Sequence, residues 1–241
     1  MTRPVDVQER ASSSLWDRYK AILESVRRTS DSTGKNSSSA SVLAVSKTRS
    51  INEIGALAQL GQTDFGENYV SEAIPKIIEF SSHSMNWHFI GTVQSNKTKP
   101  IAQHFDWVQS VDREHIAWRL NEARRNCGAI GPLNVCIQVN IDDESTKSGV
   151  SIGFLPDLVQ RVQEMPYLRL RGLMAIPRMQ SNPENSRSAF SNLYELFQSL
   201  KPAASDCWDT LSMGMTSDYQ IAIEEGSTMV RLGTALFGPR A

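Results

Sequence analysis

The chain has 241 residues, 40% of them hydrophobic, and a formal net charge of −1 at pH 7. This length is ample for one buried core and is typical of a single (β/α)8 barrel. A charge so close to balance argues against the basic surface of nucleic-acid-binding proteins, and no apolar run reaches the length of a membrane span. We therefore expect neither a nucleic acid nor a membrane as a partner.

Cysteine usage and the N-terminal composition indicate the compartment. Cys127, Cys136 and Cys207 are odd in number and lack CxxC spacing, which favours free thiols in a reducing environment. Asp6 and Glu9 lie among the N-terminal arginines, whereas transit peptides are poor in acidic residues. We expect a cytoplasmic protein, with a mitochondrial fraction left open as the alternative.

A helix and a polar connector open the chain. Apolar residues from Leu15 to Val26 recur at helical spacing, and residues 29–41 are rich in Ser, Thr, Asn and Gly. We interpret residues 1–41 as an N-terminal helix with a flexible connector, and residues 42–241 as the domain that carries the function.

From residue 42 onward, short apolar runs alternate with helical segments. The runs that predict strands are residues 42–46, 63–65, 87–90, 107–111, 133–139, 168–176, 210–215 and 229–232. Eight strands joined by crossover helices predict a parallel sheet, and at this length a closed TIM barrel. An open doubly wound sheet is the alternative, although the usual nucleotide fingerprints GxGxxG and GxxxxGK[ST] are absent. The second strand is weak, and we expect Pro75 to interrupt the helix after it.

Helix starts are marked by short polar residues. Ser50 and Glu53 form a capping box, and Asn182 precedes a proline at the start of another helix. We also expect Asp112 to cap the fifth helix of the pattern, and Ser217 to cap the helix that follows strand seven.

Lys47 closes the first apolar strand. Burying an ammonium is costly, so a lysine at this place is unusual. A desolvated lysine becomes neutral and nucleophilic, which suits chemistry with a carbonyl group. The alternative is an ordinary strand-end lysine that reaches solvent or an acidic partner.

The loops after strands seven and eight predict an anion site. In this fold they commonly hold a phosphate, and Thr216 lies just before a helix start, where backbone N–H groups are free. Gly233 and Thr234 add exposed backbone and a hydroxyl donor. Neither loop contains a lysine, so a monoester phosphate fits better than a triphosphate; ordinary turns are the alternative.

Arg231 lies within the apolar run of the eighth strand. Its guanidinium cannot lose a proton and therefore needs an acceptor, either a carboxylate or the ring nitrogen of a ligand. Together with Lys47 and the phosphate loops, this arginine suggests pyridoxal phosphate as the ligand. An arginine at the pyridine nitrogen keeps it unprotonated and weakens the ring as an electron sink.

Histidines do not indicate a metal. His83 and His88, like the other two, lack ligand-like spacing and companion cysteines. His88 lies between Trp87 and Phe89, which predicts a hydrogen-bonded core residue, with a contact to the cofactor as the alternative.

Seven stretches together resemble one family. They are residues 43–48, 65–69, 87–91 with 94–97, 147–149, 171–177, 211–215 and 226–234. In this respect the chain is similar to the pyridoxal phosphate homeostasis proteins, also called the YggS-like or proline synthetase co-transcribed family.

The resemblance implies a barrel like the N-terminal domain of alanine racemase, with pyridoxal 5'-phosphate held as a Schiff base on Lys47. The cofactor-binding residues that it implies, or that lie at the same strand ends, are Lys47, Asn68, Met174, Ser212, Thr216, Arg231, Gly233 and Thr234. Thr216 stands where the family usually has serine, and the hydroxyl is kept.

The family is regarded as a carrier or regulator of vitamin B6 and amino-acid balance without an established reaction. A racemase or decarboxylase dependent on pyridoxal phosphate is the alternative, but racemisation needs an acid or base on each face of the substrate, and Lys47 is the one evident base. Related racemases append a β-domain, which we do not expect here because few residues follow Thr234. We expect a non-catalytic monomer that delivers its cofactor to apo-enzymes, with Lys97 or Lys147 as a second aldehyde acceptor.

Overall fold

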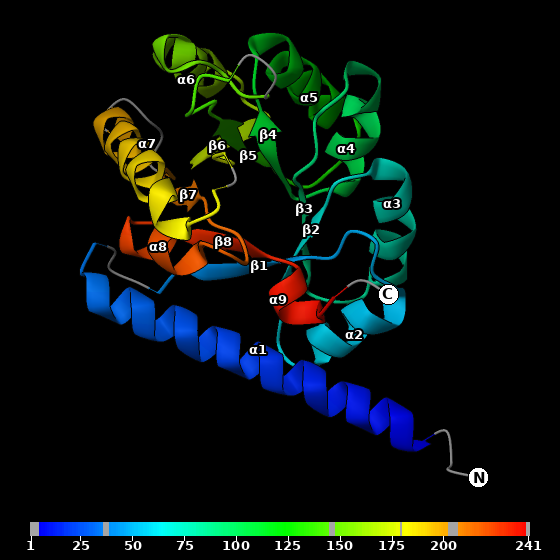
Figure 1. The fold of residues 1–241 in the computed structure, drawn as a ribbon. Helices are drawn as coiled ribbons and strands as arrows, with labels where there is room; N and C mark the ends of the chain where they lie inside the picture. Colours follow the sequence, from blue (N-terminus) through cyan, green and yellow to red (C-terminus); the bar gives the residue numbers. More distant parts are fainter. Residues whose placement is uncertain (1–4, 36–38, 145–147, 179, 202–206, 240–241) are drawn as a thin grey trace.

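The computed structural model describes residues 5–35, 39–144, 148–178, 180–201 and 207–239. Eight parallel strands form a closed barrel in chain order, and β1 closes it by pairing with both β2 and β8 (Figure 1). The strands are β1 Ser41–Val45, β2 Asp64–Glu67, β3 Asn86–Phe89, β4 Trp107–Val111, β5 Leu133–Gln138, β6 Leu168–Met174, β7 Thr210–Ser212 and β8 Met229–Leu232. The predicted barrel is thus confirmed, including the weak second strand.

Helices surround the barrel and alternate with its strands (Figure 1). The α-helices are α1 Val5–Thr33, α2 Ile51–Gln59, α3 Val70–Glu79, α4 Thr98–His104, α5 Glu114–Asn126, α6 Leu155–Gln163, α7 Arg187–Leu200, α8 Tyr219–Glu224 and α9 Thr234–Phe237. The 3-10 helices are η1 Ser95–Lys97, η2 Ile152–Phe154 and η3 Pro183–Ser186. The main core lies between these helices and the strands, where side chains such as Ile54, Phe65 and Leu120 are fully buried.

Two of the predicted helix caps are present and two are wrong. Ser50 and Glu53 form the full capping box at α2, and the Asn182 side chain accepts a hydrogen bond at the start of η3. Asp112 instead binds the Arg113 side chain at 2.7 Å, and Arg113 is the N-cap of α5. Helix α8 starts at Tyr219, two residues after Ser217, so that Ser217 lies in the loop before it.

The N-terminal helix is longer than the pattern predicts. Helix α1 runs to Thr33, into the stretch expected to be a flexible connector. Packing explains the difference: Val26, Thr29 and Ser30 are buried, and α1 lies against α8. The Thr29 hydroxyl donates to the carbonyl of Ser25 at 2.8 Å. Such bonds satisfy the polar side chains within the helix. Helix α1 lies along α8, α9 and α2 on the outside of the barrel (Figure 1).

Pro75 does not interrupt α3, contrary to the prediction. The helix continues through Pro75 to Glu79 because tertiary packing outweighs the lost hydrogen bond: Val70 and Ala73 of the same helix are buried against the barrel. Strands β6 and β7 end earlier than predicted, at Met174 and Ser212. Residues after these two ends therefore belong to loops at the barrel mouth.

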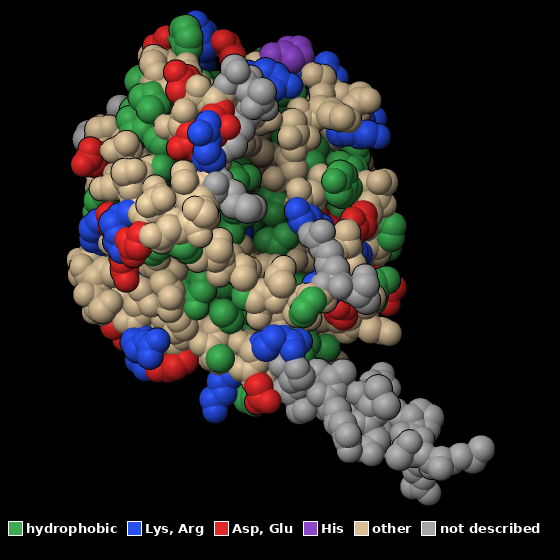
Figure 2. All heavy atoms as spheres, in the orientation of Figure 1, with side chains coloured by type: hydrophobic (Ala, Val, Ile, Leu, Met, Phe, Trp, Pro, Cys, Tyr) green, Lys and Arg blue, Asp and Glu red, His purple; other side chains and the backbone are tan. Residues whose placement is uncertain are grey.

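Surface charge is mixed. On the face shown in Figure 2, acidic and basic side chains are interspersed rather than gathered into a field of one sign. Among the residues that the structure describes, no helix combines the length and the apolar character needed to cross a bilayer.

Candidate functional site

A cavity of about 530 Å³ opens at the carboxyl ends of the strands. Its walls come from the ends of β1, β2, β3, β6, β7 and β8, which is where this fold places functional groups. The lining residues are Val45, Lys47, Arg49, Asn68, Ile90, Ile176, Met215, Thr216, Ser217, Arg231, Gly233 and Thr234. Six of the eight predicted site residues are among them.

The two other predicted residues lie beneath the cavity. Met174 is fully buried and packs with Trp107 and Cys136 inside the barrel. Ser212 is also fully buried, and its hydroxyl contacts Arg231 rather than the cavity. Ser212 therefore supports Arg231 from inside the barrel, and the contact of Met174 and Ser212 with a ligand stays a prediction.

Half-buried Lys47 lies between two residues that α3 holds in place. The buried Lys76 ammonium donates to the carbonyl of Ser46 at 3.0 Å and to Glu67 Oε1 at 2.8 Å. Ser46 Oγ donates to the same Glu67 oxygen at 2.6 Å. The residue before Lys47 is thus tied to a buried ion pair, and the start of the loop cannot move independently of α3.

The residue after Lys47 is strained. Thr48 has a φ of 63°, a left-handed conformation that a β-branched residue rarely adopts. Its backbone N–H donates to Glu72 Oε1, the same oxygen that accepts a hydrogen bond from Lys76 at 2.7 Å. Strain of this kind persists where neighbouring contacts enforce it and is common at binding sites. Sequence spacing alone does not reveal this arrangement.

Lys76, Glu67 and Glu72 form a cluster of charges, and burying the Glu67 carboxylate is costly. The Glu67 side chain is fully buried, and Oε2 is a buried atom without a hydrogen-bond partner among the described residues. Burial raises the pKa of the Glu67 carboxyl, while the hydrogen bonds from Lys76 and Ser46 oppose that shift. The carboxylate therefore depends on Lys76 to remain charged.

Arg231 is a buried cation that makes no direct ion pair with a carboxylate among the residues described here, although the charge of Asp218 acts on it. Its Nη1 donates at 2.8 Å to both the carbonyl and the hydroxyl of Ser212, and its Nη2 donates at 2.8 Å to the carbonyl of Ala175. Burial lowers the pKa of the guanidinium to about 10, so the group is still charged at neutral pH. Two of its five N–H groups make no such bond, and the side chain lines the cavity.

The loops after β7 and β8 meet at the predicted anion site. Thr216 Oγ1 accepts a hydrogen bond from the backbone N–H of Ala235 at 3.4 Å, and Thr216, Gly233 and Thr234 all line the cavity. A Cβ atom at Gly233 would meet only ordinary contacts, the nearest at 3.5 Å. The surrounding fold therefore does not require glycine at this position.

Sequence reasoning missed several lining residues. Val45 and Ile90 are apolar residues that resemble core residues in the pattern, whereas Ile176 and Met215 were expected at strand ends but not assigned to the cofactor. Arg49 was also missed: it bonds Glu53 at 3.1 Å, and its guanidinium lies over the Phe237 ring. The available signal was its position two residues after Lys47.

Of the two further candidate lysines, the structure describes one. Lys97 lines a neighbouring cavity of about 310 Å³ that shares Asn68 with the first. Lys147 lies outside the residues that the structure describes. Their role as second aldehyde acceptors stays a prediction.

His88 is a fully buried core residue that stacks on Trp107, with ring centroids 5.0 Å apart. It does not appear among the residues that line the cavity. Burial lowers the pKa of its imidazole, and the hydrogen bond to Asp64 at 3.0 Å opposes the shift. His88 is therefore neutral in the folded protein near neutral pH.

This lowered pKa predicts a pH dependence of stability. Below about pH 6.5 the unfolded chain binds a proton at this histidine that the folded state does not, so stability falls as the pH falls. We expect a slope of up to about 1.4 kcal/mol per pH unit, which His88→Gln removes. Urea unfolding of both proteins from pH 8 to pH 5 measures it, and equal slopes would contradict the assignment.

Two kinds of comparison identify the family. Residues 19–241 match the family model for the alanine racemase N-terminal domain. The pyridoxal phosphate homeostasis protein of Pasteurella multocida is 51% identical over 206 residues, which cover 84% of this chain and 88% of that protein. That of Pseudomonas aeruginosa is 45% identical over 228 residues, covering 95% and 96%. The chain belongs to the pyridoxal phosphate homeostasis protein family.

A solved structure agrees with this membership. PipY from Synechococcus elongatus, solved with PLP bound, is 29% identical and superposes with a TM-score of 0.80 over 93% of this chain and all of its own. The resemblance expected from the sequence motifs is confirmed. As expected for the family, the chain folds into an alanine-racemase-like barrel, and the cavity of about 530 Å³ lies at the carboxyl ends of the strands.

Proposed function

We propose that this chain binds pyridoxal 5'-phosphate as a Schiff base on Lys47 and acts as an intracellular carrier or regulator of this cofactor in vitamin B6 and amino-acid balance. The family membership and the cofactor bound in PipY support the ligand. The observation that carries the proposal for these residues is that Lys47 and the buried Arg231, whose guanidinium keeps two N–H groups without a bonded acceptor among the described residues, line one cavity.

The donor set fits the chemical groups of the cofactor. Lys47 offers an amine to the aldehyde, and Arg231 offers N–H donors to a ring nitrogen, which accepts a hydrogen bond when unprotonated. Thr216, Gly233 and Thr234 offer hydroxyls and backbone N–H groups to a phosphate. When bound, the cofactor supplies the aldehyde that an amine captures reversibly.

An unsatisfied atom supports the same site. Asn68 Oδ1 is buried and has no hydrogen-bond partner among the described residues, and Asn68 lines the cavity. A buried acceptor of this kind costs about 1–3 kcal/mol unless something donates to it. A ligand with a donor group near Asn68 would remove that cost.

The lining favours storage over catalysis. Lys47, Arg49 and Arg231 are the titratable side chains among the described lining residues, so Lys47 is their one evident base. Racemisation would need a second acid or base on the opposite face. An arginine at the ring nitrogen also disfavours its protonation, which weakens the electron sink that a decarboxylase or racemase needs. Apo-enzymes are the proposed recipients, and we propose a monomer.

Borohydride trapping followed by peptide mapping tests the function. We expect wild-type protein incubated with pyridoxal phosphate to gain visible absorbance and, after reduction, one cofactor mass on the peptide that contains Lys47. Colourless protein without an adduct would refute the binding. Interconversion of L- and D-alanine at ordinary enzyme rates, about 1–10³ per second, would refute the carrier role.

A further inference from the structure

A network of hydrogen-bonded polar side chains, the polar network, crosses the interior of the barrel. Barrels of this fold are usually filled by branched apolar side chains, because buried polar groups are costly unless they are hydrogen-bonded. Here five strands each contribute one residue to this polar network: Asp64 from β2, His88 from β3, Gln109 from β4, Ser212 from β7 and Arg231 from β8. It begins at the first residue of β2 and ends at the cavity wall.

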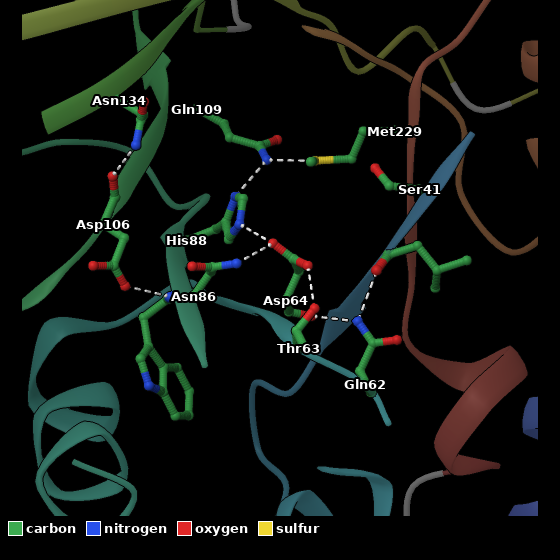
Figure 3. Close-up of polar contacts among 12 residues, drawn as sticks. Ser41, Gln62, Thr63, Asp64, Asn86, His88, Asp106, Gln109, Asn134 and Met229 are labelled. Atoms are coloured by element: carbon green, nitrogen blue, oxygen red, sulfur yellow. Dashed lines mark hydrogen bonds and ion pairs between the residues drawn. The ribbon is translucent and has the colours of Figure 1, made fainter. Parts of the chain in front are cut away.

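Figure 3 shows the lower half of the polar network, from Asp64 to Gln109. His88 Nε2 lies 3.0 Å from Asp64 Oδ1, and His88 Nδ1 lies 3.0 Å from Gln109 Nε2. The Gln109 amide also contacts the Met229 sulfur at 3.1 Å. His88 and Gln109 are fully buried, whereas the Asp64 side chain is 23% exposed. The polar network therefore reaches solvent at its Asp64 end.

The upper half joins opposite sides of the barrel. Ser212 Oγ donates to Gln109 Oε1 at 2.7 Å, which links β7 to β4 across the interior. The same hydroxyl accepts a hydrogen bond from Arg231 Nη1 at 2.8 Å. The guanidinium that faces the cavity is thus connected to residues deep in the barrel.

The chemistry of the donors and acceptors fixes one direction for the hydrogen bonds of the polar network. Arginine can only donate, so Ser212 Oγ accepts from Arg231 and passes its own hydrogen to the Gln109 oxygen. The Gln109 nitrogen then donates to His88 Nδ1, which leaves the imidazole hydrogen on Nε2, pointing at the Asp64 carboxylate. Every donor along the polar network points from the cavity toward Asp64.

We propose that Gln109 and His88 are positioning residues that, through Ser212, hold the guanidinium plane of Arg231 in its orientation toward the cavity. A fully satisfied buried network is rigid, whereas loss of one member leaves its neighbours unpaired in a low-dielectric interior. Removing Gln109 would leave Ser212 without its acceptor and His88 without its donor. Arg231 would then keep its two carbonyl contacts but lose its fixed hydroxyl contact. Only the identity of the group that Arg231 faces rests on the proposed function.

The test compares two matched substitutions of buried glutamines. Gln109→Met removes the link between Ser212 and His88. Gln62→Met removes a glutamine that donates to the backbone carbonyls of Val42 and Asp64 and bonds none of the side chains in the polar network (Figure 3). Ser212→Ala is the smaller second variant. The first readout is hydrogen exchange of the Arg231 guanidinium protons, measured by ¹⁵N NMR on protein without cofactor. The second is the dissociation constant for pyridoxal phosphate.

We expect Gln109→Met and Ser212→Ala to speed the Arg231 exchange about tenfold and to weaken pyridoxal phosphate binding by a similar factor, while Gln62→Met changes neither. Exchange that stays at the wild-type rate in Gln109→Met, or rises equally in both glutamine variants, overturns the proposal. If wild-type protein fails to bind the cofactor, the proposed function is wrong. The exchange rates of the Arg231 protons still decide whether the polar network positions Arg231.

Discussion

Replacing Lys47 by arginine is expected to abolish the reducible adduct and the visible absorbance of protein incubated with pyridoxal phosphate. Arginine keeps the positive charge and much of the length, but its guanidinium remains protonated and is a poor nucleophile toward an aldehyde. The contacts that frame the position, from Lys76 to Ser46 and from Thr48 to Glu72, do not involve the Lys47 side chain, so the fold should persist. Absorption spectra and the mass of the reduced protein measure the effect.

The matched control is Lys97→Arg. Lys97 lines the neighbouring cavity and is the described lysine whose chemistry and location are most similar. We expect this variant to keep full absorbance and a full adduct on Lys47. An adduct that survives Lys47→Arg and disappears in Lys97→Arg would reassign the covalent site.

Replacing Lys76 by methionine is expected to destabilise the protein by about 3–5 kcal/mol. The side chain of Lys76 is only 7% exposed, and its ammonium holds Glu67, Glu72 and the Ser46 carbonyl together. Without it the buried Glu67 carboxyl must either carry an uncompensated charge or take up a proton, because the hydrogen bond and charge of Lys76 that lower its pKa are lost and only the Ser46 hydrogen bond remains. Urea unfolding at pH 7 measures the change, and trapping at Lys47 should slow as the loop loosens.

Two controls separate this effect from a general loss of charge. Lys35→Met removes an ion pair to Glu225 whose side chains are 34% and 12% exposed, and it should cost at most about 1 kcal/mol because Glu225 keeps Arg187 as a partner. Combining Lys76→Met with Glu67→Leu should recover much of the stability, because replacing a whole buried pair by apolar residues is often neutral. A loss below about 1 kcal/mol in Lys76→Met would show that the cluster contributes little.

Both predictions concern the same functional requirement. A cofactor carrier needs an amine that is accessible to an aldehyde, yet positioned so that capture is selective. Here the accessible amine is Lys47, and the buried Lys76 provides the positioning from α3. The two lysines therefore have opposite roles, which an inspection of residue types alone would not separate.

Much of the fold and part of the site followed from the sequence. The barrel was predictable because each strand is a short apolar run and each crossover is a separate helical segment, so local patterns carry the architecture. Lys47, Arg231 and the residues around Thr216 and Thr234 were identifiable because strand ends in this fold gather at one face, where the structure places them around one cavity.

Local patterns failed where distant contacts decide the outcome. Pro75 remains inside a helix because α3 packs on the barrel, and α1 extends to Thr33 because its C-terminal part packs on α8, where Thr29 and Ser30 are buried. Met174 and Ser212 share the strand-end signal with the cavity residues, but their side chains are buried inside the barrel. Alternation along a strand does not state how deep each side chain lies in a closed barrel.

The sequence by itself determined the order of strands and helices and the reactive residue types at the mouth, since these depend on neighbours a few positions apart. Only the tertiary structure decided which buried charges and amides meet: Lys76 with Glu67, and Gln109 with Ser212, whose positions are 103 residues apart. The physical reason is that a buried polar group is tolerated only where a partner satisfies it, and chain closure into the barrel supplies that partner.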